Sequence, residues 1–408
     1  MNSVSEQAGK PHAGHVVAVL SFSRIERDRR VLRQCSLLTE MGAPPLVIGY
    51  GSRGDDIGHG FKAWPAPQPT TANRLRTAAR QLPAHLCSSA AHYGFWAEPR
   101  HRWALNALCE SKVKLVIAND WPALVVAARW KERTGGVIHY DSHEFAALEF
   151  DERASWRLIY KPFVRRLERA AIKSADMIST VGPRLAEELR DFYDLPTTPL
   201  VIRNIPNRIP LPDNAETAWP LRLLYHGQVL PDRGLEALID SIPLWTHPHS
   251  LMIRGDGNAA YTSQLRQRVA RVAAGREIVF EPAVSPEEVM PIAARSADIG
   301  VHFTPLETKQ RHFSLPNKLF EYIGSGLAVA VSPGADLRRI VERYALGVVS
   351  ADPGPVAIAA AINGLTRDAV IDYRTRARKA ALELNWETES DILRASLAPV
   401  LRALRARA

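Results

Sequence analysis

Short apolar runs that alternate with amphipathic helical segments constrain the fold of this chain more than any other feature. The run His15–Leu20 precedes Val31–Met41, where apolar residues recur at helical spacing, and Pro45–Tyr50 is typical of a second buried strand. Gly42 lies where such a helix is expected to end. Two buried strands joined by a helix form a βαβ unit, so the sequence predicts a parallel sheet covered by helices.

The alternation continues in two blocks separated by a proline-rich segment, Ile202–Pro220, whose weak periodicity is typical of a linker. Strands are expected at Val113–Ala118, Val137–Tyr140 and Met177–Val181 before it, and at Leu221–Tyr225, Ser250–Ile253, Glu277–Phe280, Ile299–Phe303 and Ala328–Ser332 after it. Helices are expected at Ala123–Arg133, Leu235–Ile242, Tyr261–Ala274, Pro286–Ser296 and Lys318–Ser325. The 408 residues are therefore predicted to form two parallel-sheet α/β domains, with ligands in a cleft at the carboxyl ends of the strands.

Composition narrows the function classes. No apolar run approaches the ~20 residues that span a bilayer, so we expect no transmembrane helix. Residues 1–14 lack the apolar core of a secretory signal and the three cysteines lack metal-ligand spacing, so we expect a cytoplasmic location. The net charge of +9 favours contact with phosphates of a nucleotide, a lipid headgroup or a nucleic acid. Because no nucleic-acid-binding motif accompanies this charge, no nucleic-acid partner is expected.

The loop after Leu221–Tyr225 has the composition of a phosphate site. Gly227 and Gly234 let the backbone approach an anion. Arg233 stands just before the next helix, whose dipole also favours a phosphate. The alternative is a tight turn with a solvated arginine.

A second loop, containing Ser314, Leu315 and Asn317, opens the helix that carries Lys318 and Glu321. The helix macrodipole disfavours a cation in the first turn, so Lys318 indicates a bound anion. Glu321 lies about one turn later and is suited to accept hydrogen bonds from a ribose or sugar diol. The alternative is a surface ion pair between Lys318 and Glu321.

Three charged residues, Asp141, His143 and Glu144, follow the expected strand Val137–Tyr140. Burying such residues is costly unless they meet water or a polar ligand, so we expect them at a ligand cleft. Asp120 holds the equivalent place after another expected strand. The alternative is that these residues cap the helices that follow them.

In their order and spacing, the motifs resemble those of glycosyltransferase family 4, whose GT-B architecture has two facing Rossmann-like domains with a cleft between them. The resemblance extends from about His15 to the C-terminus. It rests on Asp28-x-Arg30-Val31, Asp141-x-His143-Glu144, the Gly227–Gly234 loop, Gly255-Asp256-Gly257, Ala297–Val301, Leu315–Tyr322, Gly326–Val329 and Asn385-Trp386-Glu387. It implies an acceptor-side domain over 15–205 after the polar leader 1–14, a linker over 206–220, a nucleotide-sugar-binding domain over 221–385 and returning helices over 386–408.

The resemblance also implies an activity: transfer of a sugar, of the hexosyltransferase type, from a nucleotide-diphosphate sugar to a hydroxyl, with retention of anomeric configuration. No metal or other cofactor is implied, and the sequence contains no Asp-x-Asp triplet. The expected donor is a UDP-sugar, with a GDP-sugar as the alternative. The expected acceptor is a small molecule, a glycan or a lipid-linked compound. Oligomeric state is left open.

Individual residues take roles by position in this family. Arg233 and Lys318 would bind the donor diphosphate, and Glu321 the ribose hydroxyls. The remaining donor-site positions are Gly227, Gly234, Ser314, Leu315 and Asn317. His143 would contact the donor sugar near the reacting carbon, with Glu144 beside it as the second catalytic position.

Some positions depart from the family pattern. Gln228 stands where many members have a cation, and Phe313 where many have a glutamate that contacts the donor sugar. The loop Ser21–Arg29 lacks a common glycine pair. The acceptor-side candidates near this loop and after the following strands are Arg24, Asp28 and Asp120, and the arginines Arg24, Arg27, Arg29 and Arg30 are expected to meet an anionic acceptor.

Other readings compete with transfer. Gln228 and Phe313 also suit a catalytically degenerate partner subunit, and a nucleotide-sugar 2-epimerase shares the architecture. A dinucleotide oxidoreductase is disfavoured because no Gly-x-Gly-x-x-Gly follows the first strand. The stretch Arg153–Lys173 mixes apolar residues with cations. It would suit peripheral contact with the inner face of an anionic membrane, or a helix packed on the first sheet. Pro162 is expected to interrupt a single long helix here.

Overall fold

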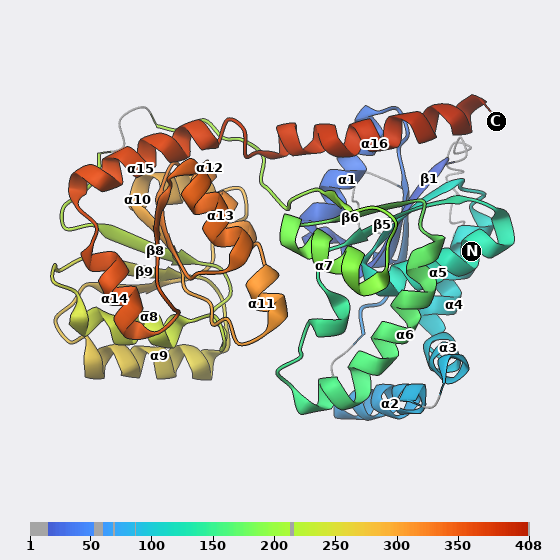
Figure 1. Ribbon diagram of the computed structural model, residues 1–408, viewed down its shortest axis with the longest axis horizontal. Helices are drawn as coiled ribbons and strands as arrows, with labels where there is room; N and C mark the ends of the chain where they lie inside the picture. Colours follow the sequence, from blue (N-terminus) through green and yellow to red (C-terminus); the bar gives the residue numbers. More distant parts are fainter. Residues whose placement is uncertain (1–14, 53–59, 68–69, 86, 213–215, 407–408) are drawn as a thin grey trace, which may run out of the picture. The chain divides into compact units, whose positions relative to one another are not determined.

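The structure, a computed structural model, describes residues 15–52, 60–67, 70–85, 87–212 and 216–406, so the polar leader over 1–14 lies outside the described residues. The chain forms two compact units (Figure 1). The first unit takes in the chain up to Thr180, then Ala186–Val201 and the residues from Leu393 on. The second unit takes in Val181–Leu185 and Ile202–Ile392.

The first unit contains a parallel sheet of seven strands in the order β3-β2-β1-β4-β5-β6-β7. Its strands are β1 (Val17–Arg24), β2 (Leu46–Tyr50), β3 (Gly60–Trp64), β4 (Leu115–Asn119), β5 (Val137–Ser142), β6 (Met177–Thr180) and β7 (Leu200–Val201). Its central strands are buried along most of their length, as expected for a parallel sheet covered on both faces.

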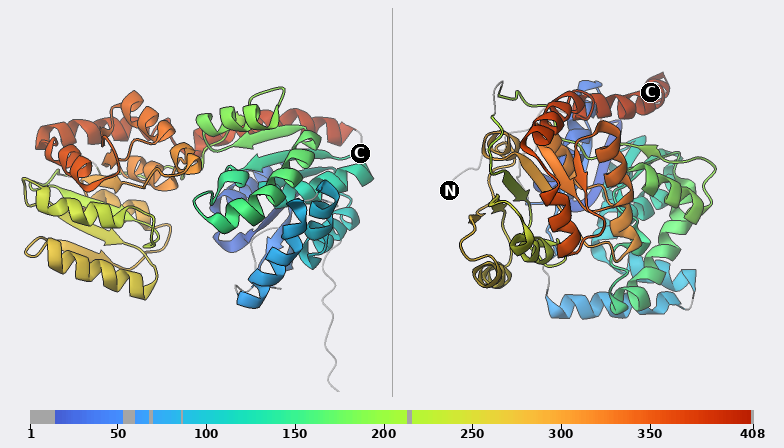
Figure 2. Two further views of the ribbon diagram at one scale, coloured as in Figure 1. Left: turned by 60° about the horizontal axis from the view of Figure 1, so that its bottom comes forward. Right: turned by 60° about the vertical axis from the view of Figure 1, so that its left-hand side comes forward.

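Helices connect these strands and cover the sheet (Figures 1 and 2). They are α1 (Arg29–Glu40), α2 (Thr71–Gln81), α3 (Ser88–Trp96), α4 (Pro99–Glu110), α5 (Asp120–Thr134), α6 (Lys161–Ala171) and α7 (Pro183–Tyr193), with short turns η1 (Ile25–Arg27), η2 (Leu82–His85), η3 (Ala146–Leu148), η4 (Trp156–Tyr160) and η5 (Ile172–Ser174). The final helix α16 (Trp386–Ala406) begins in the second unit and ends in the first.

The second unit contains a parallel sheet of six strands in the order β10-β9-β8-β11-β12-β13. Its strands are β8 (Arg222–His226), β9 (Ser250–Arg254), β10 (Ile278–Glu281), β11 (Ile299–His302), β12 (Ala328–Val331) and β13 (Gly347–Val349). Its helices are α8 (Leu235–Ser241), α9 (Ala259–Val272), α10 (Val289–Ser296), α11 (Lys309–Phe313), α12 (Asn317–Gly324), α13 (Ala335–Tyr344), α14 (Pro355–Asn363) and α15 (Arg367–Ala380), with the short turn η6 (Ile242–Leu244) after α8.

Alternation along β8 divides the core of the second unit between the two faces of its sheet. Leu223 and Tyr225 belong to one apolar cluster, with residues of α8, α9 and α14, whereas Leu224 belongs to a second, with residues of α10, α12, α13 and α15. Both sheets have the same strand order, which reverses between β1 and β4 in the first unit and between β8 and β11 in the second. Ligands of such folds bind at the carboxyl ends of the strands beside these switch points.

The prediction of two parallel-sheet α/β domains is confirmed. Some strand ends were predicted wrongly. β1 continues to Arg24, beyond the expected end at Leu20 and into the expected loop, and β5 continues through Asp141 and Ser142, which pair in register with β6. As expected from Pro162, the stretch Arg153–Lys173 is not one helix. It divides into η4, a π-helical turn, and α6, which has Pro162 in its first turn and buries Phe163, Val164 and Leu167.

A buried carboxylate, Asp298, anchors the sheet of the second unit. It is fully buried and accepts hydrogen bonds from the backbone N–H of Arg222 at 2.9 Å and from its guanidinium at 2.9 and 3.0 Å. Arg374 on α15 donates to the same carboxylate at 3.1 Å. One side chain therefore ties the start of β8 to a helix about 150 residues later in the chain.

Asp298→Ala should lower the free energy of unfolding of the second unit by about 3–5 kcal/mol, because it leaves the largely buried Arg374 without its counter-charge. Asp240→Ala is the matched control, because its pair with Arg268 is partly exposed and should contribute less than about 1 kcal/mol. Urea unfolding followed by circular dichroism measures both. Equal losses in the two variants would contradict the anchoring role.

Within the described part of the chain, no helix is long and apolar enough to cross a membrane.

Candidate functional site

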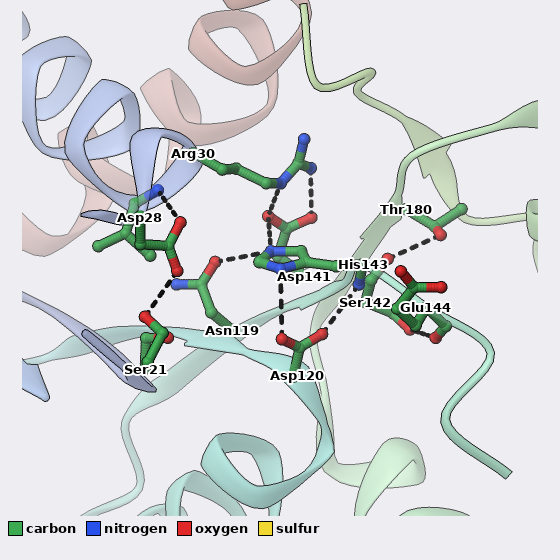
Figure 3. A network of polar contacts seen from close by, with 12 residues as sticks. Ser21, Asp28, Arg30, Asn119, Asp120, Asp141, Ser142, His143, Glu144 and Thr180 are labelled. Atoms are coloured by element: carbon green, nitrogen blue, oxygen red, sulfur yellow. Dashed lines mark hydrogen bonds and ion pairs between the residues drawn. The ribbon is translucent and has the colours of Figure 1, made fainter. Parts of the chain in front are cut away.

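A polar network lies at the carboxyl ends of β4 and β5 in the first unit (Figure 3). Its centre is Asp141, whose side chain is 1% exposed. Arg30 on α1 donates to both carboxylate oxygens at 2.7 Å, and Gln34, one turn later, donates at 2.6 Å. Ser179 on β6 donates at 2.7 Å. Burial alone would raise the pKa of Asp141, but Arg30 and His143 hold it well below its usual range.

His143 lies against this network, and both of its ring nitrogens are occupied. Nε2 is 3.1 Å from Asn119 Oδ1 and 3.3 Å from Asp141 Oδ2, while Nδ1 is 3.2 Å from Asp120 Oδ2. Burial opposes a charge on the ring, but the carboxylates of Asp120 and Asp141 raise the pKa of His143 to about 10. The side chain is 19% exposed. His143 is therefore an imidazolium at neutral pH and a hydrogen-bond donor rather than a base.

The two sides of this imidazolium differ in exposure. Asp141 is buried, whereas the side chain of Asp120 is 44% exposed. Asp120 also accepts the backbone N–H of His143 at 3.1 Å, and its own backbone has a φ of 64°. A ligand would therefore meet the Nδ1 edge of the ring, beside Asp120, while the Nε2 edge is anchored in the unit.

The structure does not support the capping alternative for these residues. No side chain caps α5 at Asn119, and none caps η3 at Phe145. Glu144 is exposed, and Ser142 donates to its backbone carbonyl at 2.9 Å. Glu149, which the sequence did not single out, lies near Glu144 and Asp120; burial raises its pKa to about 8, reinforced by those two charges.

Among the acceptor-side candidates, Arg30 was assigned wrongly. It is 3% exposed and bound to Asp141, so it is not available to an anionic acceptor. Asp28 caps α1 by accepting the backbone N–H of Val31 at 3.1 Å, and Ser23 donates to it at 2.6 Å. Arg24, at the end of β1, is exposed.

In the second unit, the loop after β8 depends on glycines that let backbone approach backbone. A Cβ on Gly255 would lie 1.7 Å from the carbonyl oxygen of Gly227, and Gly227 itself has a φ of 120°. Gly234 has a φ of 77°, and a Cβ there would lie 1.7 Å from the carbonyl oxygen of Phe303. Side chains at these positions would force the loops after β8, β9 and β11 apart.

Lys318 lies beside this loop. Its Nζ is 3.9 Å from the centre of the Tyr225 ring, and it would be 3.2 Å from a Cβ on Gly227. Burial lowers the pKa of Lys318 to about 7, an effect that Arg233 increases and Glu321 opposes. Arg233 is exposed. Lys318 thus lies beside the backbone of Gly227, at the carboxyl edge of the sheet, and Arg233 is close enough to act on its charge.

Glu321 lies on the same helix as Lys318, and its carboxylate is 3.3 Å from Nε2 of His226. Its side chain is 21% exposed, so it is not directed wholly into bulk solvent. Burial, with Lys318 and Arg254 nearby, lowers the pKa of His226 to about 3, so the imidazole is neutral. The contact with Glu321 is therefore not an ion pair at neutral pH.

The other predicted donor-site residues differ in exposure. Ser314 follows α11 as its C-cap, Leu315 is buried in the core of the second unit, and Asn317 begins α12 and is exposed. Arg311 lies 3.6 Å from Asp232, which links α11 to the loop before α8. The two donor loops are therefore held in one unit.

Three polar residues of this site were not predicted from the sequence: His226 and His302, on which Lys318 acts, and Arg254, which acts on His226. Each is the last residue of its strand, β8, β9 or β11. Burial lowers the pKa of His302 well below its usual range, and Lys318 and Arg233 lower it further. Polar residues at the ends of apolar runs were the signal that could have identified them.

The two residues that depart from the family pattern, Gln228 and Phe313, both make contacts within the second unit. Gln228 is exposed, and its carbonyl accepts the Tyr225 hydroxyl at 2.8 Å. Phe313 is 7% exposed, with the Arg184 guanidinium 5.7 Å from its ring centre. Among the described residues, no group of three or more His, Cys, Asp or Glu side chains is arranged to hold a metal ion.

Two family models match consecutive parts of the chain. A glycosyl transferase 4-like domain matches residues 27–206, and a glycosyl transferases group 1 domain matches residues 220–368. Among curated protein sequences, none matches this chain.

Several solved structures share the fold at low sequence identity. Sucrose-phosphate synthase from Thermosynechococcus elongatus superposes with a TM-score of 0.72 at 15% identity, covering 96% of this chain and 99% of its own. HepE from Anabaena, solved with UDP and glucose, superposes with a TM-score of 0.66 at 14% identity, covering 94% and 99%. WaaG, a glycosyltransferase involved in lipopolysaccharide biosynthesis, gives 0.62 at 15% identity, covering 92% and 99%. Taken with the two family models, the chain belongs to the GT-B glycosyltransferases of the family 4 type.

Proposed function

We propose that this glycosyltransferase moves a sugar from a nucleotide-diphosphate sugar to a hydroxyl of a small molecule, a glycan or a lipid-linked acceptor, with retention of anomeric configuration and without a metal ion. The observation that carries the proposal is the pair of cations beside the glycine loop. Burial lowers the pKa of Lys318 because no anion near it fully offsets the cost of its charge. A diphosphate would supply that anion.

Each residue of the donor site then has a physical task. Arg233 and Lys318 bind the diphosphate, and the glycine loop lets backbone approach the phosphates. Glu321, held beside His226, accepts the ribose hydroxyls. The missing cation at Gln228 is replaced by Arg254, whose charge acts on the same His226. Because charge develops on the leaving phosphate, these cations stabilise the transition state more than the bound substrate.

His143 acts as a hydrogen-bond donor to the donor sugar through Nδ1, where a sugar hydroxyl shares or replaces the contact with the partly exposed Asp120. An imidazolium with a pKa of about 10 does not accept the acceptor proton at neutral pH. The departing phosphate is then the group placed to take that proton, with the acceptor attacking from the face that the phosphate leaves. We nominate no covalent nucleophile.

A UDP-sugar is the donor we propose first, because HepE, which shares the fold, is solved with UDP and glucose. A GDP-sugar is the alternative. The exposed Gln228 favours a degenerate partner subunit as the second candidate, but the cations beside Gly227 weigh against it. A location in the cytoplasm, with peripheral membrane contact through η4, stays a proposal; Leu158 on that turn is 65% exposed.

Arg233→Ala should weaken UDP binding by about ten- to a hundredfold, because a charge-assisted contact to phosphate contributes about 1.5–3 kcal/mol. Arg271→Ala, which removes an exposed arginine at the end of α9, is the control and should bind UDP normally. Isothermal titration calorimetry measures both affinities. Unchanged affinity in Arg233→Ala would remove this residue from the donor site.

UDP affinity should fall as the pH rises from about 7 to 9. In the free protein Lys318 loses its proton near pH 7, whereas a bound diphosphate raises its pKa, so binding takes up a proton in this range. Each pH unit should cost up to about tenfold in affinity. Calorimetry in buffers of different ionisation enthalpy detects the proton uptake. Lys318→Arg keeps its charge and should show a flat profile; a flat profile in the unaltered protein would contradict the assignment.

His143→Ala should lower kcat by about ten- to a hundredfold while leaving UDP affinity within twofold, because the nucleotide is proposed to bind to the other unit. His92→Ala, on α3, is the matched control. Turnover is followed as UDP release from the donor sugar in the presence of acceptor. Normal turnover in His143→Ala would give the residue a purely structural role.

A further inference from the structure

A pocket of about 200 Å³ opens in the first unit beside the carboxyl ends of β1 and β2. Its walls include six aromatic side chains: Phe22, Tyr50, Phe95, His101, Trp121 and Phe163. They come from two strands and four helices, so the pocket is a product of the tertiary fold rather than of one segment.

The six rings form one continuous chain of contacts. Tyr50 and Phe22 have centroids 6.0 Å apart, Phe22 meets the edge of His101 at 5.1 Å, and His101 stacks on Phe95 at 3.8 Å. The chain then continues from Phe95 to Trp121 and from Trp121 to Phe163, each at 6.0 Å. Such contacts fix the orientation of each ring, so the wall is rigid.

A glycine on α3 allows this helix to approach the end of α2 closely at one side of the pocket. A Cβ on Gly94 of α3 would lie 2.2 Å from the backbone oxygen of Arg80, near the end of α2. Burial lowers the pKa of His101 to about 3, so its ring is neutral and adds no charge to the wall. The part of the wall that the six rings form is therefore uncharged and flat. The rest of the lining carries charge: Arg80 pairs with Glu98, and Arg100 donates to Nε2 of His101 at 3.3 Å.

One polar atom of the lining lacks a partner. Oε1 of Gln81, the last residue of α2, is buried without a hydrogen-bond partner among the residues that the structure describes. A buried acceptor without a donor costs about 1–3 kcal/mol, so a ligand that brings a donor to this atom gains affinity.

The pocket adjoins the His143 network. Trp121 lines the pocket, and Asp120, which precedes it in the chain, accepts Nδ1 of His143 (Figure 3). Phe22 follows Ser21, which pairs in register with Asn119, and Asn119 accepts Nε2 of His143. A molecule that fills the pocket is therefore held on the acceptor side of the residue proposed to contact the donor sugar.

The volume of the pocket and the chemistry of its walls determine which ligand fits. A dry cavity of roughly 150 Å³ holds one benzene ring, so this pocket holds one ring with a small substituent. A sugar ring placed against the six aromatic rings would leave the hydroxyls on that side unpaired, which is costly. An aromatic ring stacks on them instead, and one donor at its edge can be offered to Oε1 of Gln81.

On the basis of the proposed transfer activity, we propose that this pocket is the acceptor subsite for an aromatic group that carries one hydrogen-bond donor. The acceptor is then amphipathic: its aromatic group fills the pocket, and its hydroxyl-bearing part extends to the Asp120 edge of His143.

Three glucosides test the proposal by titration of the UDP-loaded protein, followed by saturation-transfer NMR: methyl, phenyl and 4-hydroxyphenyl β-glucoside. Phenyl β-glucoside should bind about tenfold more tightly than the methyl compound, because it buries a ring. The 4-hydroxyl should add a further threefold or more. Thr77→Trp, which fills the pocket from α2, should abolish both gains, and Gln81→Leu only the second.

The control variant is Tyr93→Ala, which changes a residue of α3 that is 81% exposed and outside the lining, and should leave all three affinities unchanged. Histidine-selective NMR, with the His143 signal assigned from His143→Gln, should show that signal shifting with 4-hydroxyphenyl β-glucoside but not with phenol. Equal affinity for the methyl and phenyl compounds, or an unshifted His143 signal, would overturn the proposal.

Failure of the proposed function is distinguishable from failure of the subsite. A protein that does not bind UDP contradicts the transfer activity. The same titrations repeated without UDP still report whether the pocket selects the aromatic ring.

Discussion

The polar network at the carboxyl ends of β4 and β5 depends on the buried carboxylate of Asp141. A charge removed from water is tolerated only when it is paired and hydrogen-bonded. Arg30, Gln34 and Ser179 meet that demand from α1 and β6. The same carboxylate contacts Nε2 of His143, so the orientation of the imidazolium proposed to contact the donor sugar follows from a structural ion pair.

The second unit buries a positive charge that is compensated less completely. At its proposed donor site Lys318 lies beside the Tyr225 ring and the backbone of Gly227, and the nearby Glu321 offsets only part of the cost of burying its charge. Glycines make this possible: a side chain at Gly234 or Gly255 would collide with backbone, and one at Gly227 would crowd the Lys318 ammonium group. At the first site, neighbouring groups compensate the cost of burying a charge, which stabilises the fold. At the second site much of that cost is not compensated, which favours the binding of an anion.

The sequence was sufficient for the fold because hydrophobic periodicity reports burial directly. Runs such as Val137–Tyr140 marked strands whose both faces are covered. It placed strand ends less well: Asp141 belongs to β5 because its charge is compensated by Arg30, a residue 111 positions earlier that no local pattern identifies. The strand Gly60–Trp64 and the helices α2 to α4 were not predicted, because their apolar residues lie in shorter and less regular patterns.

The candidate site was predictable where it depends on local chemistry and not where it depends on tertiary contacts. The glycines and Arg233 lie in one loop and Lys318 lies in the first turn of a helix, so the local sequence pattern indicated them. His302 and Arg254 come near His226 only because β8, β9 and β11 are neighbours in the sheet. The aromatic pocket likewise brings together residues from positions 22 to 163, and no pattern in the sequence predicts it.

The final helix gives the chain an order of assembly. From Leu393 on, α16 belongs to the first unit, where Arg394 pairs with Glu40 and Arg405 donates to the carbonyl oxygens of Met41 and Gly42. Leu397 and Leu401 are buried there. During synthesis, therefore, the ribosome must pass through the whole second unit before the first can receive its last helix, so the unit that begins first is completed last.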